Sequence, residues 1–286
     1  MVVRVHVDTD LGDDPDDLCA LAYLLARPDV DLVGVTTVDD PDGGRAQLAR
    51  EVLQLGGAGD VQVASGAAPT AAGDLLATSV GANAVVLGIG PASTLATAER
   101  ARPGLLGSAH VVLMGGWLVL PPPGFPAWPA SRDTNVVRDV PAAVEVRRAA
   151  GRLTVVPLAA TVQAHLRSRD LPRLLAAGAL GAWIVRDVEA YRDRRGTARL
   201  AATHSRLPDD LALLLHDPLA AAVAVGWPGA TVEGRRLRTA PEDPHGRLVP
   251  ADEDEPDGRD VHVVVGVDGP AFAAHWLSTL LGLRSA

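Results

Sequence analysis

The chain has 286 residues, of which 48% are apolar and only 3% aromatic, so its composition indicates a folded domain with an aliphatic core. Its net charge of −9 argues against a nucleic-acid partner, because binding a phosphate backbone requires clustered positive charge. Cys19 is the single cysteine, which excludes an internal disulfide framework and a cysteine-based zinc site.

The N-terminal residues are β-rich and lack the charged and then apolar pattern of a signal peptide. No apolar run reaches the roughly 20 residues that a membrane-spanning helix needs. We therefore expect a cytoplasmic protein without a membrane partner.

The first part of the chain alternates β-rich with helical stretches. Predicted strands cover residues 2–7, 31–38, 61–64, 84–87, 110–114 and 153–156, and predicted helices cover 16–26, 45–55, 91–100 and 141–150. This alternation is typical of right-handed βαβ units. It predicts an α/β fold with a mostly parallel, Rossmann-like central sheet and helices on both faces. Ligands of such sheets bind outside the carboxyl ends of the strands.

The second part is predicted to be mainly helical over residues 170–225, including the apolar stretch 211–225. Two β-rich stretches follow at 230–237 and 260–267, separated by a polar loop at 241–257. A final helix is predicted at 270–283, with Asp268 as its N-cap. We expect a single domain over residues 1–286, in which 165–215 form a mainly helical part beside the functional site.

An acidic loop follows the first predicted strand, where residues 8–17 read DTDLGDDPDD. Six carboxylates within ten residues repel one another, and confining them costs free energy unless a cation compensates. Hard divalent ions prefer oxygen ligands. The loop is therefore either a divalent-cation site or an Asp-rich helix start with solvated side chains. An EF-hand fits poorly, because Gly12 stands at a ligand position and no Glu closes the loop.

A second polar motif, His216-Asp217, interrupts the apolar stretch at 211–225. Burying an unpaired carboxylate is costly, so Asp217 needs a partner. A metal ion beside Asp217 would keep it ionised, and His216 could then protonate a leaving group. The alternative is an N-cap Asp before Pro218 with His216 packed in the core. A weaker signal is the strand end VVLMGG at 111–116, followed by the polar residues 133–135 (DTN).

Together these motifs resemble the inosine–uridine-type nucleoside hydrolase family, whose signature Asp-x-Asp-Pro-Gly-x-Asp-Asp ends the first strand. Residues 8–12 (DTDLG) match its first part, and Asp16-Asp17 match its last part. The motifs VTTV (35–38), IGP (89–91), VVLMGG, Asn135 with VPAA after it, and HDP (216–218) recur in family order. The resemblance covers roughly residues 3–225.

The resemblance implies that calcium-activated water hydrolyses the N-glycosidic bond of a ribonucleoside or related N-riboside. It implies Ca²⁺ and no organic cofactor, and a homodimer or homotetramer. Asp10 would be both a calcium ligand and the general base, and His216 would protonate the departing base. The other implied ligands are Asp17, Asp217 and the backbone carbonyl of Ile89. The implied sugar contacts are Asp16 and Asn135 for the 2′- and 3′-hydroxyls, and Asp133 for the 5′-hydroxyl.

The acidic signature is two residues longer than the family pattern. Asp13 or Asp14 therefore replaces or joins Asp16 as a metal ligand, and we include Asp14 among the predicted ligands. Leu11 replaces the usual Pro, and Ala159 stands where an Asp is typical. The family's Asn after VTTV has no clear match, and the loop between the third and fourth strands is shorter. The residues expected around the nucleobase thus differ from the family pattern, so the sequence does not predict which base is released. The Pro- and Trp-rich stretch 115–128 is either a base-facing lid or a surface loop.

Two other functions compete with this one. A haloacid-dehalogenase-type phosphatase also opens with Asp-x-Asp, but it typically needs Gly-Thr next and a later Lys. This chain has Leu11-Gly12 and no lysine. The second alternative is a non-catalytic relative that binds a metal or a ligand.

Overall fold

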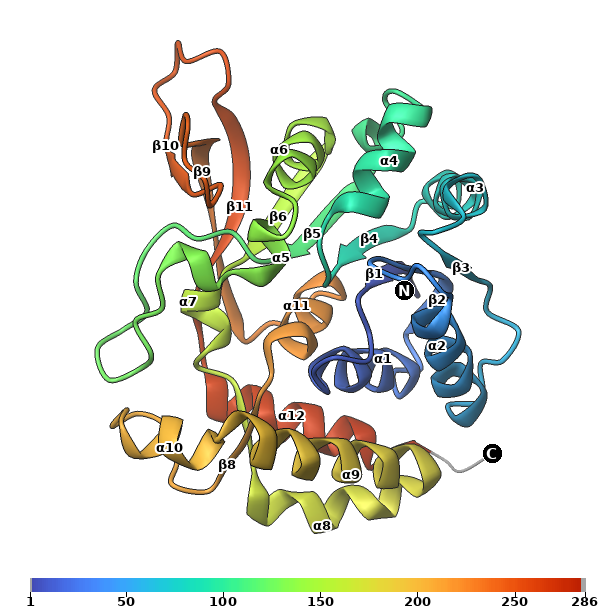
Figure 1. Cartoon of the computed structure of the whole chain (residues 1–286), viewed down its shortest axis with the longest axis vertical. Coiled ribbons are helices and arrows are strands. Elements are labelled where there is room, and N and C mark those ends of the chain that lie inside the picture. The colour runs from blue at the N-terminus through green and yellow to red at the C-terminus, as the bar shows by residue number, and fades with distance from the viewer. Residues whose placement is uncertain (1, 284–286) are drawn as a thin grey trace.

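The computed structural model describes residues 2–283 and contains one nine-stranded sheet with helices on both faces (Figure 1). The strand order is β10-β9-β11-β6-β5-β4-β1-β2-β3. All neighbours from β11 to β3 pair in parallel, whereas β9 and β10 are antiparallel to their neighbours at one edge. The predicted mostly parallel α/β sheet is therefore confirmed. The strands of this sheet are β1 (Val3–Thr9), β2 (Val30–Thr37), β3 (Val63–Ser65), β4 (Val85–Gly88), β5 (His110–Met114), β6 (Arg152–Val156), β9 (Ala230–Thr239), β10 (Leu248–Pro250) and β11 (Arg259–Val267).

The helices form two layers. Helices α3, α4 and α6 cover one face of the sheet, and α1, α2 and α11 cover the other (Figure 1). No helix in the described part of the chain is long and apolar enough to cross a membrane. The helices are α1 (Asp16–Leu25), α2 (Gly44–Leu55), α3 (Pro69–Gly81), α4 (Ser93–Ala101), α5 (Thr134–Val137), α6 (Val140–Ala149), α7 (Leu158–Thr161), α8 (Leu171–Leu174), α9 (Gly178–Arg195), α10 (Thr197–Ala202), α11 (His216–Ala224) and α12 (Gly269–Leu280).

Strand β1 lies inside the sheet, because it pairs with β2 on one side and β4 on the other. Val5 and Val7 are fully buried, which is why this strand is nearly continuous in valine. His6 on the opposite face is also buried, and its ring nitrogens lie 2.9 Å from the Ser79 hydroxyl and 3.1 Å from the Thr36 hydroxyl. The chain therefore leaves the middle of the sheet at Thr9 and enters the acidic loop directly.

Helix α1 packs between the sheet and the surrounding helices and is buried on all sides from Asp16 to Leu24. Phe272 and Trp276 of α12 belong to the same hydrophobic core, and the Trp276 indole donates to the Cys19 carbonyl at 3.2 Å. Helix α11, which contacts α1, is buried along nearly its whole length. Polar side chains at the starts of these two helices are thereby held in an apolar setting.

The prediction of a helix over 211–225 is wrong for its first five residues. Leu211–Leu214 form strand β8, which pairs antiparallel with β7 (His165–Arg167) in a separate two-stranded sheet. A short run of leucines fits a buried strand and a buried helix equally well, because neither leaves a periodic polar pattern. The helix begins at His216.

Two further elements differ from the prediction. Helix α3 was not predicted, and β10 lies within the stretch expected to be a loop. The Asp268 cap of the last helix is confirmed, because its carboxylate accepts from the Ala271 amide at 2.9 Å.

Candidate active site

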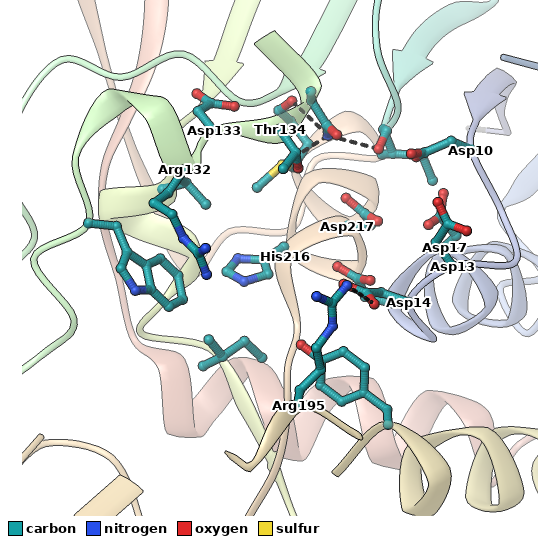
Figure 2. A pocket seen from close by; sticks show the side chains of 18 of the residues that line it. Asp10, Asp13, Asp14, Asp17, Arg132, Asp133, Thr134, Arg195, His216 and Asp217 are labelled. Carbon is teal, nitrogen blue, oxygen red and sulfur yellow. Dashed lines mark hydrogen bonds and ion pairs between the residues drawn. The ribbon is translucent and has the colours of Figure 1, made fainter. Parts of the chain in front are cut away.

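A cavity of about 780 Å³ opens where the chain leaves strands β1 and β4. The starts of helices α1 and α11 reach the same space (Figure 2). All of the residues predicted for the site line this cavity, namely Asp10, Asp14, Asp16, Asp17, Ile89, Asp133, Asn135, His216 and Asp217.

Three buried carboxylates meet at the centre of the cavity. Asp16, Asp17 and Asp217 each place an oxygen within 4.8 Å of the others. Asp16 and Asp17 lie in the first turn of α1, and Asp217 lies in the first turn of α11. The positive ends of two helix dipoles therefore face the same group of carboxylates. The Thr9 hydroxyl at the end of β1 donates to Asp17 and holds its side chain in place.

These carboxylates cannot all be ionised without a counter-charge. Burial, followed by repulsion from Asp14, raises the pKa of Asp16 to about 7. Burial and the neighbouring carboxylates raise the pKa values of Asp17 and Asp217 well above the ordinary value. A hard divalent cation relieves this repulsion and takes oxygen ligands. The donor set thus fits a metal ion, and Ile89, whose carbonyl was predicted as a ligand, lines the same cavity.

Asp10 lines the same cavity but is not one of the three carboxylates whose oxygens lie within 4.8 Å of one another. Its charge contributes to raising the pKa of both Asp17 and Asp217. Its carboxylate accepts from the Arg138 guanidinium at 3.0 Å. Burial raises the pKa of Asp10 to about 6, although Arg138 and Arg45 act in the opposite direction.

Asp13 and Asp14 also line the cavity, but they are not part of the group of three carboxylates. Asp14, which was predicted to be a metal ligand, pairs with Arg195 of α9 at 2.8 Å. Asp13 pairs with Arg45 of α2 at 2.9 Å and is about half exposed. Among the carboxylates left open by the sequence, Asp16 is thus the one that lies with Asp17 and Asp217.

Gly12 and Arg45 allow the acidic loop to adopt this longer path between β1 and α1. Gly12 has φ +120°, a conformation that side chains other than hydrogen disfavour, and a Cβ there would lie 2.9 Å from Leu48. The Arg45 guanidinium donates to the carbonyl oxygens of Asp10 and, at 3.0 Å, of Leu11. The loop backbone is therefore fixed by an arginine of α2.

Asp133 and Asn135 approach the cavity from the segment around α5. The Asn135 amide donates to the Ile89 carbonyl at 2.8 Å, so it sits at the end of β4. One oxygen of Asp133 accepts from the Gly116 amide at 2.6 Å, and the other is buried and has no partner within residues 2–283. Burial raises the pKa of Asp133 to about 6. Asp133 thus offers a free oxygen for a hydroxyl group.

His216 forms part of the opposite wall. Its Nδ1 lies 2.7 Å from the Thr161 hydroxyl, and its ring centroid lies 6.1 Å from that of Trp128. Burial lowers the pKa of His216 to about 4, so the ring is neutral at pH 7. A neutral imidazole held through Nδ1 leaves Nε2 for a hydrogen bond to a bound molecule.

Trp128, from the stretch 115–128 considered as a base-facing lid, lines the cavity. Several other side chains of the cavity wall were not predicted from the sequence, namely Arg132, Arg138, Tyr191, Arg194 and Arg195. The arginines carry no sequence signal in a chain where all 26 basic residues are arginine. The aromatic residues lie in segments whose contacts with the cavity depend on the tertiary fold.

Comparison with known proteins places the chain in a family. The family model described as inosine-uridine preferring nucleoside hydrolase matches residues 5–274. No match was found among curated protein sequences.

Solved structures share the fold over nearly the whole length. A plant nucleoside hydrolase, the PpNRh1 enzyme, is 20% identical with a TM-score of 0.78, covering 98% of this chain and 99% of that one. A purine-preferring ribonucleoside hydrolase from Gardnerella vaginalis is 23% identical with a TM-score of 0.77, covering 98% of each chain. An inosine-uridine preferring nucleoside hydrolase from Bacillus anthracis is 21% identical with a TM-score of 0.68, covering 98% and 99%. With the family match extending over most of its length, the chain belongs to the inosine-uridine preferring nucleoside hydrolase family.

Proposed function

We propose that this chain hydrolyses the N-glycosidic bond of a ribonucleoside or related N-riboside with the help of Ca²⁺. The observation that carries the proposal is the meeting of Asp10, from the end of β1, with Asp217, from the start of α11, in one cavity. These residues are far apart along the chain, yet both line the same cavity, next to buried carboxylates that need a counter-charge.

The ion would be held by the carboxylates of Asp10, Asp17 and Asp217 and by the Ile89 carbonyl. When bound, it supplies positive charge that acidifies water and attracts hydroxyl oxygens. Asp16 is close enough to Asp217 to serve either the ion or a ribose hydroxyl. Asp14 has its own partner in Arg195, so it is not assigned to the metal.

Asp10 accepts a proton from the attacking water, on the side of the ribose that faces the carboxylates. Asn135 and the free oxygen of Asp133 bind ribose hydroxyls and orient the sugar. In Figure 2, Asp10 and His216 lie on opposite sides of the cavity. This arrangement suits hydrolysis through an oxocarbenium-like state, in which water enters on one face while the base leaves from the other.

The direct test is a screen of purine, pyrimidine and modified ribosides for release of reducing sugar, with calcium and with a chelator. We expect at least one riboside to be hydrolysed in calcium, and the chelator to abolish its hydrolysis. Absence of hydrolysis across the panel in the calcium-loaded protein would contradict the proposal.

His216→Ala is expected to lower the rate by about 100-fold for nucleosides whose base leaves poorly, because His216 donates a hydrogen bond or proton to that base. The loss should shrink for ribosides with good leaving groups, such as p-nitrophenyl riboside. His204→Ala, at a histidine outside the cavity lining, is the control and should leave both rates unchanged. An equal loss for good and poor leaving groups would show that His216 acts only structurally.

One observation favours a second candidate, a relative that binds a metal and a ligand without hydrolysing it. The Arg138 guanidinium pairs with Asp10, the residue proposed as the base. If this pair persists with calcium bound, the two positive charges together lower the basicity of Asp10 and disfavour proton transfer from water. Binding of a riboside in calorimetry, combined with no release of sugar, would identify this second function.

A further inference from the structure

Four arginines line the cavity, and three of them have acceptors on the acidic loop. Arg132 is the exception: within residues 2–283 its guanidinium has no hydrogen-bond acceptor and no carboxylate at ion-pair distance. A positive charge without a partner therefore faces the space where a substrate would bind. The three partnered arginines are Arg138 with Asp10, Arg195 with Asp14, and Arg194 with the backbone carbonyl of Asp13.

The nearest carboxylate along the chain does not neutralise Arg132. Asp133 follows it directly, but that carboxylate is buried and accepts from the Gly116 amide. In Figure 2, the Arg132 guanidinium points toward His216, whereas the Asp133 carboxylate points away from it. The Arg132 guanidinium thus lies on the side of the cavity that holds His216, and not on the side of the acidic loop.

The wall on this side is aromatic and fixed. Trp128 lies beside His216, and its carbonyl accepts from the Trp117 indole at 3.0 Å. Trp128 also packs against the small hydrophobic cluster that contains Leu207 and Leu214. A flat aromatic wall next to a free guanidinium suits a planar ring that carries an oxyanion, because guanidinium binds carboxylate through two parallel hydrogen bonds.

We propose that Arg132 binds a carboxylate on the leaving base, so that the favoured substrates of this chain are N-ribosides of carboxylated heterocycles. The inference rests on the proposed N-ribohydrolase function and names its substrate class. A phosphate at the ribose 5′ position would offer Arg132 an oxyanion of the same kind. Because Arg132 points toward His216, we place the oxyanion on the nucleobase and not on the ribose.

The test compares nicotinic acid riboside with nicotinamide riboside, which differ only in a carboxylate against an amide. For the calcium-loaded chain we expect kcat/KM to be at least about tenfold higher for the acid, as a charged hydrogen bond provides. In Arg132→Gln this ratio should fall by about tenfold or more. The control is Arg199→Gln on α10, which removes the same charge from an exposed residue outside the cavity lining and should keep the ratio.

The outcomes separate this inference from the proposed function. Hydrolysis of both ribosides with a ratio that Arg132→Gln does not change would overturn the inference and leave the function intact. If neither riboside is hydrolysed, the wider riboside screen still tests the function, and calorimetric binding of the two ribosides tests the inference. Arg132-dependent preference for the acid supports the inference, and equal binding overturns it. A third outcome is a preference for uridine 5′-monophosphate over uridine that depends on Arg132, without a preference for nicotinic acid riboside. It would show that Arg132 binds an oxyanion on the ribose, and it would refute binding to a carboxylate on the nucleobase.

Discussion

Replacing Asp10 with Ala is expected to lower riboside hydrolysis by about 10²–10⁴-fold or to abolish it, the range that a general base contributes. Asp10 is the carboxylate that combines a position at the end of β1 with a pKa of about 6, raised by burial against the effect of two arginines. At pH 7 it is therefore mostly ionised and can still accept a proton readily. The measurement is the rate of reducing-sugar release for the best substrate of the screen, at saturating calcium.

Two further variants make this prediction specific. Asp10→Asn keeps the shape of the side chain but cannot take a proton, so we expect it to be as inactive as Asp10→Ala. Asp42→Asn is the control, because Asp42 is exposed in the loop after β2 and lies outside the cavity lining. Full activity in either Asp10 variant, at unchanged calcium affinity, would show that another residue is the base.

The parts of this site that the sequence predicts are those in which a local pattern carries the information. A valine-rich stretch followed at once by carboxylates indicates a buried strand that ends at a ligand site, and β1 ends at Thr9, next to Asp10. Asp16 and Asp17 precede an apolar helical pattern, and they occupy the first turn of α1. Local chemistry was sufficient here because neighbours in the chain remain neighbours in the fold.

The ion pair of Asp14 could not be predicted from the local sequence. Its role depends on Arg195, a residue 181 positions later that α9 brings to the cavity. Asp14 precedes the predicted helix and Asp16 begins it, but neither position reveals which of the two carboxylates lies with Asp17 and Asp217. The distinction arises in the fold, where Asp13 pairs with Arg45 of α2 and Asp14 with Arg195 of α9.

The positions of the arginine side chains could not be predicted from the local sequence either. Arg132 lies next to Asp133, yet the two side chains diverge, because Asp133 turns inward to the Gly116 amide. Arg138 lies one helical turn after Asn135, but its pairing with Asp10 joins segments 128 residues apart. In both cases the sequence specifies the charge, whereas the fold decides whether that charge neutralises the site or faces a substrate.

Calcium is expected to raise the melting temperature of this chain, and the increase should be larger at pH 8 than at pH 6. A ligand that binds only the folded state at about 100 times its dissociation constant adds roughly 2.7 kcal/mol to the free energy of unfolding. For a chain of 286 residues that corresponds to an increase of about 4–5 °C. Protons compete with the ion for Asp16, Asp17 and Asp217, whose pKa values burial raises, so calcium binds more weakly as the pH falls.

Without metal, the pH dependence should have the opposite direction. The folded-state pKa values of Asp8 and Asp16, about 8 and about 7, lie above the value of 3.8 expected for an unfolded chain. Between pH 8 and pH 4 these carboxyl groups therefore bind protons in the folded state that they do not bind in the unfolded state, which raises the free energy of unfolding as the pH falls. His6, His110 and His216, whose pKa values burial lowers, oppose this effect below about pH 6.5. In chelator we expect the melting temperature to be higher at pH 6 than at pH 8 by roughly 5 °C or more, since a tenfold difference in proton affinity between the folded and unfolded states corresponds to about 1.4 kcal/mol per group.

Asp217→Asn distinguishes a metal site from a general effect of pH. This variant removes one carboxylate from the group of three, so repulsion among the remaining two is weaker without metal. We expect it to lose most of the calcium-induced increase in melting temperature and to show a smaller pH dependence in chelator. Asp42→Asn should behave like the unmodified chain in both respects. Since Mg²⁺ demands a tighter octahedral shell and gives up its water reluctantly, it should stabilise the chain less than calcium at equal concentration. If millimolar calcium at pH 8 leaves the melting temperature unchanged, the buried carboxylates do not form a calcium site, and their cost in the folded state must be met by protonation alone.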